Sequence, residues 1–213
     1  MDVNYPDRST VDDLLPEVTY PDFYELRQNP ATSPVEDIRK RARQAVDSLS
    51  LDDLTADATI GVGLGSRGIT DVVSAARGVV DELQSRGYDV VVLPAMGSHG
   101  GASAEGQRDT LAALGLTEET LGCPIDARME TAVLGTSEAG NDVHFAESAL
   151  DVDAVCVINR VKPHTNFSGT FESGLTKMTC IGLGKQPGAK TIHQRSIGDG
   201  YEETLRASFE TIR

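Results

Sequence analysis

Two short apolar runs with an amphipathic helix between them constrain the fold of this chain more than any other feature. Residues 58–63 and 88–94 predict buried strands, and the second is rich in β-branched residues, as in parallel strands covered on both faces. Between them, apolar residues recur at helical spacing from Thr70 to about Ser85. A strand, a helix and a strand within roughly 35 residues form a βαβ unit. The chain therefore predicts an α/β fold.

The rest of the 213-residue chain extends this pattern. Residues 1–31 are rich in Pro, Asp and Tyr and lack periodicity, so they predict an extended N-terminal arm, and residues 32–213 form the predicted domain. Its sheet is expected to be Rossmann-like, mostly parallel and flanked by helices. Further strands are predicted within residues 123–148 and 150–159, and further helices at 33–49 (capped by Ser33), 103–114, from 117, and 199–213. The last helix has no capping signal, so we expect the chain to be part of a longer polypeptide.

Charge and composition exclude several classes of partner. A net charge of −14 and an isoelectric point of about 4.6 repel nucleic acid and anionic membranes, so any anion site must supply its own positive charge. Abundant acids, only five lysines and no tryptophan predict adaptation to high salt. Three cysteines without Cys-x-x-Cys spacing predict neither a disulfide framework nor a four-cysteine zinc site. No signal region and no apolar run of ~18 residues is present, which predicts a cytoplasmic protein.

Lysine and histidine are concentrated where ligands bind in this class of fold. In an open α/β sheet, ligands lie beyond the carboxyl ends of the strands. The glycine turn at 63–68, a glycine-rich loop that carries His99, and the segment that begins at Asn159 each follow a predicted strand, so we expect them at one edge of the sheet. The third segment holds most of the reactive side chains: Lys162, His164, Lys177, Lys185, Lys190 and His193.

The glycine turn leaves two interpretations open. Gly63-x-Gly65-x-x-Gly68 matches a dinucleotide-binding fingerprint, but the second strand ends in Leu93-Pro94 with no acid to hold a ribose, which argues against NAD. What remains is an anion site made by a helix N-terminus with Arg67 beside it. The alternative is a tight turn with a solvated arginine.

The histidines and lysines also carry alternatives. His99, on a loop at the end of a strand, favours a functional role over a hydrogen bond that fixes the loop, whereas His144, in a predicted strand, favours a structural or surface role. Lys177 lies in an uncharged run, so its amine is expected to be partly desolvated and nucleophilic, unless its head reaches water. For Lys185 and Lys190, a side-chain amine that reaches water is the better interpretation.

Four sequence elements together resemble the lactate racemase family that uses a nickel-pincer nucleotide. The resemblance covers about residues 55 to 195. The elements are Gly97-Ser98-His99, Arg160-Val161-Lys162-Pro163-His164 with Phe167-Ser168-Gly169, Gly174-Leu175-Thr176-Lys177 with a glycine-rich continuation to Gly184, and Thr191-Ile192-His193.

This resemblance implies a function and a role for each residue. The chain would be the cofactor-binding N-terminal domain of a racemase or epimerase, acting on a 2-hydroxy acid by proton-coupled hydride transfer. The implied cofactor is pyridinium-3,5-bisthiocarboxylic acid mononucleotide nickel. Lys177 would bind it covalently, His193 would bind its nickel, and Gly65, Gly174 and Thr176 would contact it. His99 and His164 would be the acid/base pair, and Arg67 would hold the substrate carboxylate.

The chain also departs from the family pattern. The interval from His164 to Lys177, 177 − 164 = 13 residues, is longer than the family leads us to expect, and Ile181 replaces the usual proline, which indicates a divergent branch. Family members close the site with a second domain, so the chain alone is expected to turn over little or nothing. Two other functions remain open: a zinc-dependent hydrolase that uses His99, His164 and His193, although their intervals of 65 and 29 residues give it no support, and a non-catalytic module that binds a nucleotide or organic anion.

Overall fold

The computed structural model describes residues 6–12, 15, 21–25, 27, 33–160, 162, 168–170, 172 and 174–213. The chain divides into two compact units, Met1–Pro34 and Val35–Arg213. In the first unit, where the sequence predicts an extended arm, the described residues include a helix of just over one turn, α1 (Arg8–Asp12). The Asp7 carboxylate accepts a hydrogen bond from the backbone of Ser9 and so begins this helix.

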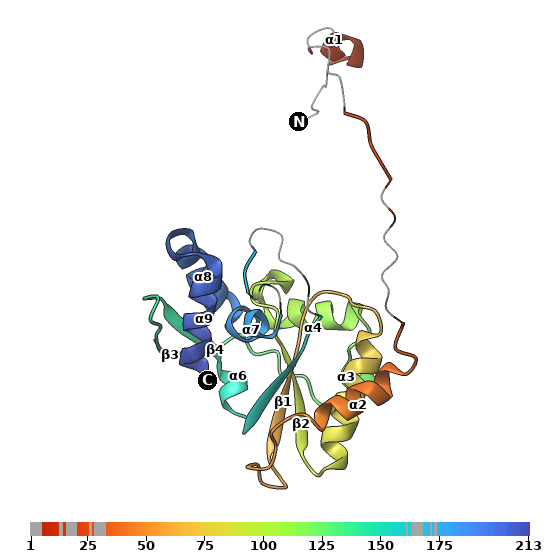
Figure 1. The fold of residues 1–213 in the computed structure, drawn as a ribbon, viewed down its shortest axis with the longest axis vertical. Coiled ribbons are helices and arrows are strands. Elements are labelled where there is room, and N and C mark those ends of the chain that lie inside the picture. Colours follow the sequence, from red (N-terminus) through yellow and green to blue (C-terminus); the bar gives the residue numbers. More distant parts are fainter. Residues whose placement is uncertain are drawn as a thin grey trace. The chain divides into compact units, whose positions relative to one another are not determined.

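A three-stranded parallel sheet in the order β2-β1-β5 lies at the centre of the second unit (Figure 1). Its strands are β1 (Thr59–Leu64), β2 (Asp89–Pro94) and β5 (Ala154–Ile158). The predicted α/β class with a parallel sheet and flanking helices is therefore confirmed. In the register, Leu64 pairs with both Pro94 and Ile158, so the three strands end at one edge.

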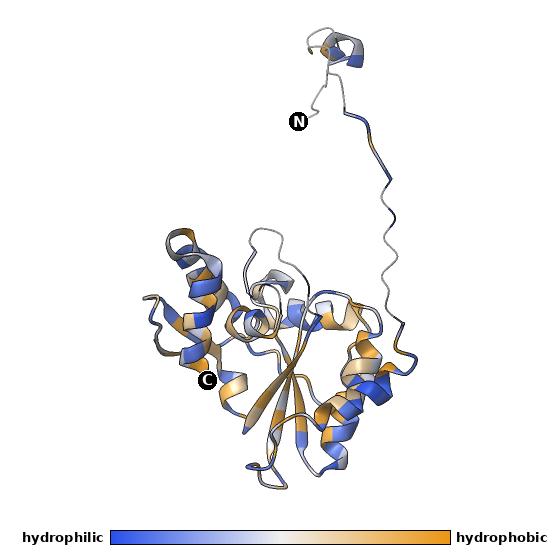
Figure 2. Cartoon of the chain, in the orientation of Figure 1, coloured by the Kyte–Doolittle hydropathy of each residue, from blue (hydrophilic) through white to orange (hydrophobic). Residues whose placement is uncertain are grey.

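Helices cover one side of this sheet through an apolar core. Helices α2 (Ile38–Val46) and α3 (Val72–Ser85) pack against each other there, and α4 (Ala104–Ala113) and α5 (Glu118–Leu121) complete the layer. Figure 2 shows the strands in hydrophobic colours and long hydrophilic stretches on α2 and α3. Burial of both sheet faces explains why the strands are continuous apolar runs.

Two helix starts differ from the prediction by a few residues. The first predicted helix begins at Ile38 rather than after Ser33, since the Asp37 carboxylate accepts a hydrogen bond from the backbone of Lys40 at 2.9 Å. Helix α3 begins at Val72 rather than at Thr70, after Asp71 in the left-handed region (φ 59°). Ser103 caps α4 as predicted.

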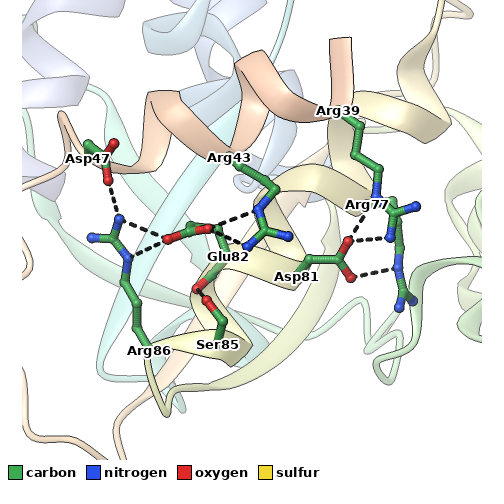
Figure 3. A network of polar contacts seen from close by, with 8 residues as sticks. All are labelled: Arg39, Arg43, Asp47, Arg77, Asp81, Glu82, Ser85 and Arg86. Atoms are coloured by element: carbon green, nitrogen blue, oxygen red, sulfur yellow. Dashed lines mark hydrogen bonds and ion pairs between the residues drawn. The ribbon is translucent and has the colours of Figure 1, made fainter. Parts of the chain in front are cut away.

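An ion network joins α2 to α3 on their solvent side (Figure 3). Asp81 binds Arg39 and Arg77, and Glu82 binds Arg43 and Arg86. Arg86 also pairs with Asp47, at the end of α2. Because these arginines are partly exposed, each pair contributes at most about 1 kcal/mol and weakens in salt.

Helices α2 and α3 approach each other closely at Gly78. A Cβ at Gly78 would lie 2.5 Å from the Arg39 carbonyl oxygen and 2.9 Å from the Ala42 Cβ, so Gly78→Ala is expected to destabilise the protein by about 1–3 kcal/mol. Gly198, in helix α8 (Lys185–Asp199), has no neighbour within 4 Å, and Gly198→Ala should instead stabilise by about 0.5–1 kcal/mol. Urea unfolding measures both changes. Equal stability of Gly78→Ala and the wild type would contradict the close packing.

The remaining elements lie on the other side of the sheet (Figure 1). Strands β3 (Thr131–Thr136) and β4 (Asp142–Ala146) form an antiparallel hairpin, followed by α6 (Glu147–Leu150). Helix α7 (Leu175–Lys177) continues into a π-helical turn, Met178–Gly182, then α8, and α9 (Tyr201–Ile212). None of the described helices is long and apolar enough to cross a membrane.

Candidate active site

A cavity of about 460 Å³ lies at the carboxyl edge of the parallel sheet. Its wall is built by residues that follow β1, β2 and β5, together with parts of α7, the π-helical turn and α8. The expectation that the three polar segments meet at one edge is therefore confirmed. The predicted site residues in the wall are Gly65, Arg67, His99, Gly174, Lys177 and His193.

One predicted site residue is not part of that wall, and another lies outside the described residues. Thr176 belongs to α7 but does not line the cavity. His164, the predicted partner of His99, lies outside the described residues, as does most of the segment around it. Arg160 and Lys162, which precede His164 in the sequence, do line the cavity.

His99 is held at the end of β2 by a serine that the sequence analysis did not single out. Its Nδ1 lies 2.5 Å from the Ser66 hydroxyl, which belongs to the glycine turn after β1. Partial burial of the ring, followed by the charges of Arg67 and Lys177, lowers the pKa of His99. The imidazole is therefore neutral at physiological pH, as a general base requires.

Four basic side chains line the cavity, in a chain whose net charge is −14: Arg67, Arg160, Lys162 and Lys177. Burial lowers the pKa of Lys177, as its uncharged sequence neighbourhood predicts, and the charges of Lys162 and Arg67 lower it further. An amine with a lowered pKa is more often unprotonated and hence nucleophilic. The cavity thus has the local positive charge that an anion site in this acidic chain needs.

His193 lies within α8, where the sequence left it near a helix start or in a loop. Its Nδ1 contacts the carbonyl oxygen of Ala189, which can only accept, so Nδ1 carries the proton. Its Nε2 then accepts a hydrogen bond from the Tyr201 hydroxyl at 2.9 Å. The Tyr201 ring also lies 5.8 Å from the Lys177 amine. A histidine fixed in this tautomer presents the Nε2 lone pair that a metal ion needs.

The prediction that the Lys185 amine reaches water is wrong. Lys185 is 0% exposed, and its Nζ donates to the Pro94 carbonyl at 2.8 Å and to the Gln107 Oε1 at 3.1 Å. The segment before Lys185 lies close against the residue that follows β2, since a Cβ at Gly182 would lie 2.6 Å from the Ala95 carbonyl oxygen. Lys190 is exposed, as predicted.

Burial of Lys185 makes stability depend on pH. Burial lowers the pKa of Lys185 to about 8 from an ordinary value of 10.5. Between these values the unfolded chain binds the proton and the folded chain does not, so the free energy of unfolding rises with pH over this range, on the order of 3 kcal/mol. The check is urea unfolding of the wild type and Lys185→Met from pH 7 to pH 10.5. A difference between them that stays constant with pH would contradict the burial.

His144 and the first fingerprint glycine have structural roles. His144 lies in β4, half-buried, and its backbone carbonyl packs against Gly184 and Gly188 at the start of α8. Gly63 lies inside β1, where a Cβ would be 2.8 Å from the Val157 side chain, so it serves strand packing rather than a phosphate loop. The turn that borders the cavity begins at Gly65.

The fold and this cavity together define an α/β domain with a cavity of ligand size at the ends of its strands. Residues 15–204 match the lactate racemase N-terminal domain family, and the chain belongs to that family. No curated protein matches the chain. Among the residues that the structure describes, no group of three or more His, Cys, Asp or Glu side chains is placed to hold a metal ion.

Proposed function

We propose that this chain is the cofactor-binding half of a racemase or epimerase of 2-hydroxy acids that uses a nickel-pincer nucleotide. One observation carries the proposal: Arg67, His99, Lys177 and His193, far apart in sequence, line one cavity in a family of lactate racemase domains. Neither a nucleophilic amine nor a histidine in a fixed tautomer is needed by a simple anion-binding module.

The residues of the cavity fit such a cofactor. The Nε2 of His193 would bind its nickel, once the Tyr201 hydroxyl moves away from this nitrogen. Lys177 offers an amine of lowered pKa for the covalent bond. Gly65 lets the turn lie close against Met178, since a Cβ there would lie 3.3 Å from the Met178 sulfur, and both residues line the cavity. The volume of about 460 Å³ is typical of ligand sites.

The side chains of this domain would bind the substrate and move its protons. When bound, the nucleotide supplies a carbon that accepts the C2 hydride of the hydroxy acid and returns it. Arg67 pairs with the substrate carboxylate, and the neutral His99 takes the hydroxyl proton at Nε2. Because Nε2 must be unprotonated to take that proton, Nδ1 of His99 carries its hydrogen and donates it to the Ser66 hydroxyl oxygen both before and after the transfer. His164 is the proposed base on the opposite face, and a second domain is proposed to close the site.

An isotope experiment tests this chemistry. The protein, purified from its own host, is incubated with each enantiomer of lactate carrying deuterium at C2. Hydride transfer predicts that the other enantiomer appears with deuterium retained at C2. Loss of deuterium to water during inversion would show proton abstraction instead and contradict the proposal. Binding of lactate without inversion would favour the binding module.

The zinc-dependent hydrolase has no comparable support. Its three histidines would have to converge on one metal ion, and their intervals of 65 and 29 residues give no support for that.

A further inference from the structure

Two fully buried polar side chains near the cavity have no part in the proposed reaction. Lys185, at the start of α8, and Gln107, on α4, are each 0% exposed. They bind each other, Nζ to Oε1, at 3.1 Å. The Lys185 amine also donates to the Pro94 carbonyl, and the Gln107 amide nitrogen donates to the carbonyls of Gly97 at 2.9 Å and His99 at 3.4 Å.

Such a pair is costly to keep if it serves packing alone. A buried ammonium loses its hydration, and a methionine and a leucine of similar volume would fill the same space without that loss. Lys185 also adopts the left-handed region (φ 52°), which disfavours residues with a side chain. The negative charge of Asp126 raises the pKa of Lys185, but it offsets only part of the lowering that burial causes.

The carbonyls that the pair binds belong to the loop that carries His99. Pro94 ends β2, and Gly97 and His99 follow it. The backbone nitrogen of Gly97 also donates to the Gly182 carbonyl at 3.0 Å. Lys185 comes directly after the segment that carries Lys177 and begins the helix that carries His193. The pair therefore links the His99 loop to the chain segment of the other two site residues.

We propose that Lys185 and Gln107 are positioning residues, which hold the His99 loop against the segment of Lys177 and His193 and so fix the acid/base imidazole over the ligand cavity. The effect that we expect on turnover rests on the proposed function. The position of His99 itself can be measured independently of any activity.

The first readout is the titration of His99, followed by NMR on histidine-labelled protein and assigned with His99→Asn. In the wild type, burial, Arg67 and Lys177 hold the pKa of His99 below its ordinary value. In Lys185→Met and Gln107→Leu, the loop is expected to swing toward solvent, and the pKa of His99 should rise by about half a unit or more. Lys190→Met, an exposed lysine on the same helix, is the matched control and should leave it unchanged.

A second readout separates this inference from the proposed function. In the protein from its own host, both variants should lower kcat for lactate at least about tenfold with a smaller change in KM, since the binding groups stay in place. A raised His99 pKa in a protein that never inverts lactate would support the positioning pair and contradict only the racemase. If Lys185→Met does not fold, the pKa of His99 in Gln107→Leu and in Gln107→Asn tests the inference instead. Folded variants in which His99 titrates as in the wild type would overturn the inference.

Discussion

Replacing His99 with asparagine is expected to lower turnover of a 2-hydroxy acid by about 10²–10⁴-fold, with the nickel content unchanged. Asparagine keeps a polar group near the Ser66 hydroxyl but cannot take a proton at physiological pH. Because His99 lines the cavity near Arg67 and Lys177 while His193 is the proposed nickel ligand, the metal should stay bound. Steady-state kinetics and elemental analysis of the same sample measure both quantities.

The matched control for His99 is another of the four histidines. His144 lies in β4 and does not line the cavity, so His144→Asn is expected to leave turnover within a few-fold of the wild type. Metal loss from His99→Asn would identify His99 as a ligand, which is the arrangement that the zinc-dependent hydrolase needs.

Replacing Lys177 or His193 with alanine is expected to remove the cofactor itself. Without the Lys177 amine no covalent adduct can form, so the mass increment on the intact protein should disappear. Without the His193 Nε2 the nickel loses its protein ligand, and bound nickel should fall from near one per chain by about tenfold or more. Intact-protein mass spectrometry and elemental analysis read these losses directly.

An exposed lysine on the same helix as His193 provides the control. Lys190→Ala changes the charge by the same amount as Lys177→Ala but lies outside the cavity wall, so adduct and nickel should both be retained. A Lys177→Ala protein that keeps the mass increment would place the attachment elsewhere. One that keeps nickel without the increment would indicate non-covalent binding.

The local sequence pattern predicted the strands of the parallel sheet and the edge of that sheet at which the site lies. Residues 58–63, 88–94 and 150–159 are apolar runs between turns, and the parallel pairing of β1 with β2 and β5 brings their carboxyl ends together. Helix starts were off by a few residues because neighbouring polar side chains compete for the cap, as Asp37 does with Ser33.

The partners of the site residues depend on tertiary contacts that no local pattern reveals. Ser66 meets His99 across 33 positions of sequence, and Gln107 meets Lys185 across 78. Polar neighbours in sequence predicted a solvated Lys185, whereas the close approach of Gly182 to β2 buries it. The Tyr201 contact with His193 spans two helices, and nothing in the spacing marks it.

The most direct test of the account is the metal content of the protein purified from its own host. The proposed nucleotide predicts nickel near one atom per chain, retained through dialysis and lost on His193→Ala. Zinc near one atom per chain, or nickel that His193→Ala leaves in place, would contradict the assignment of this cavity to a nickel-pincer nucleotide.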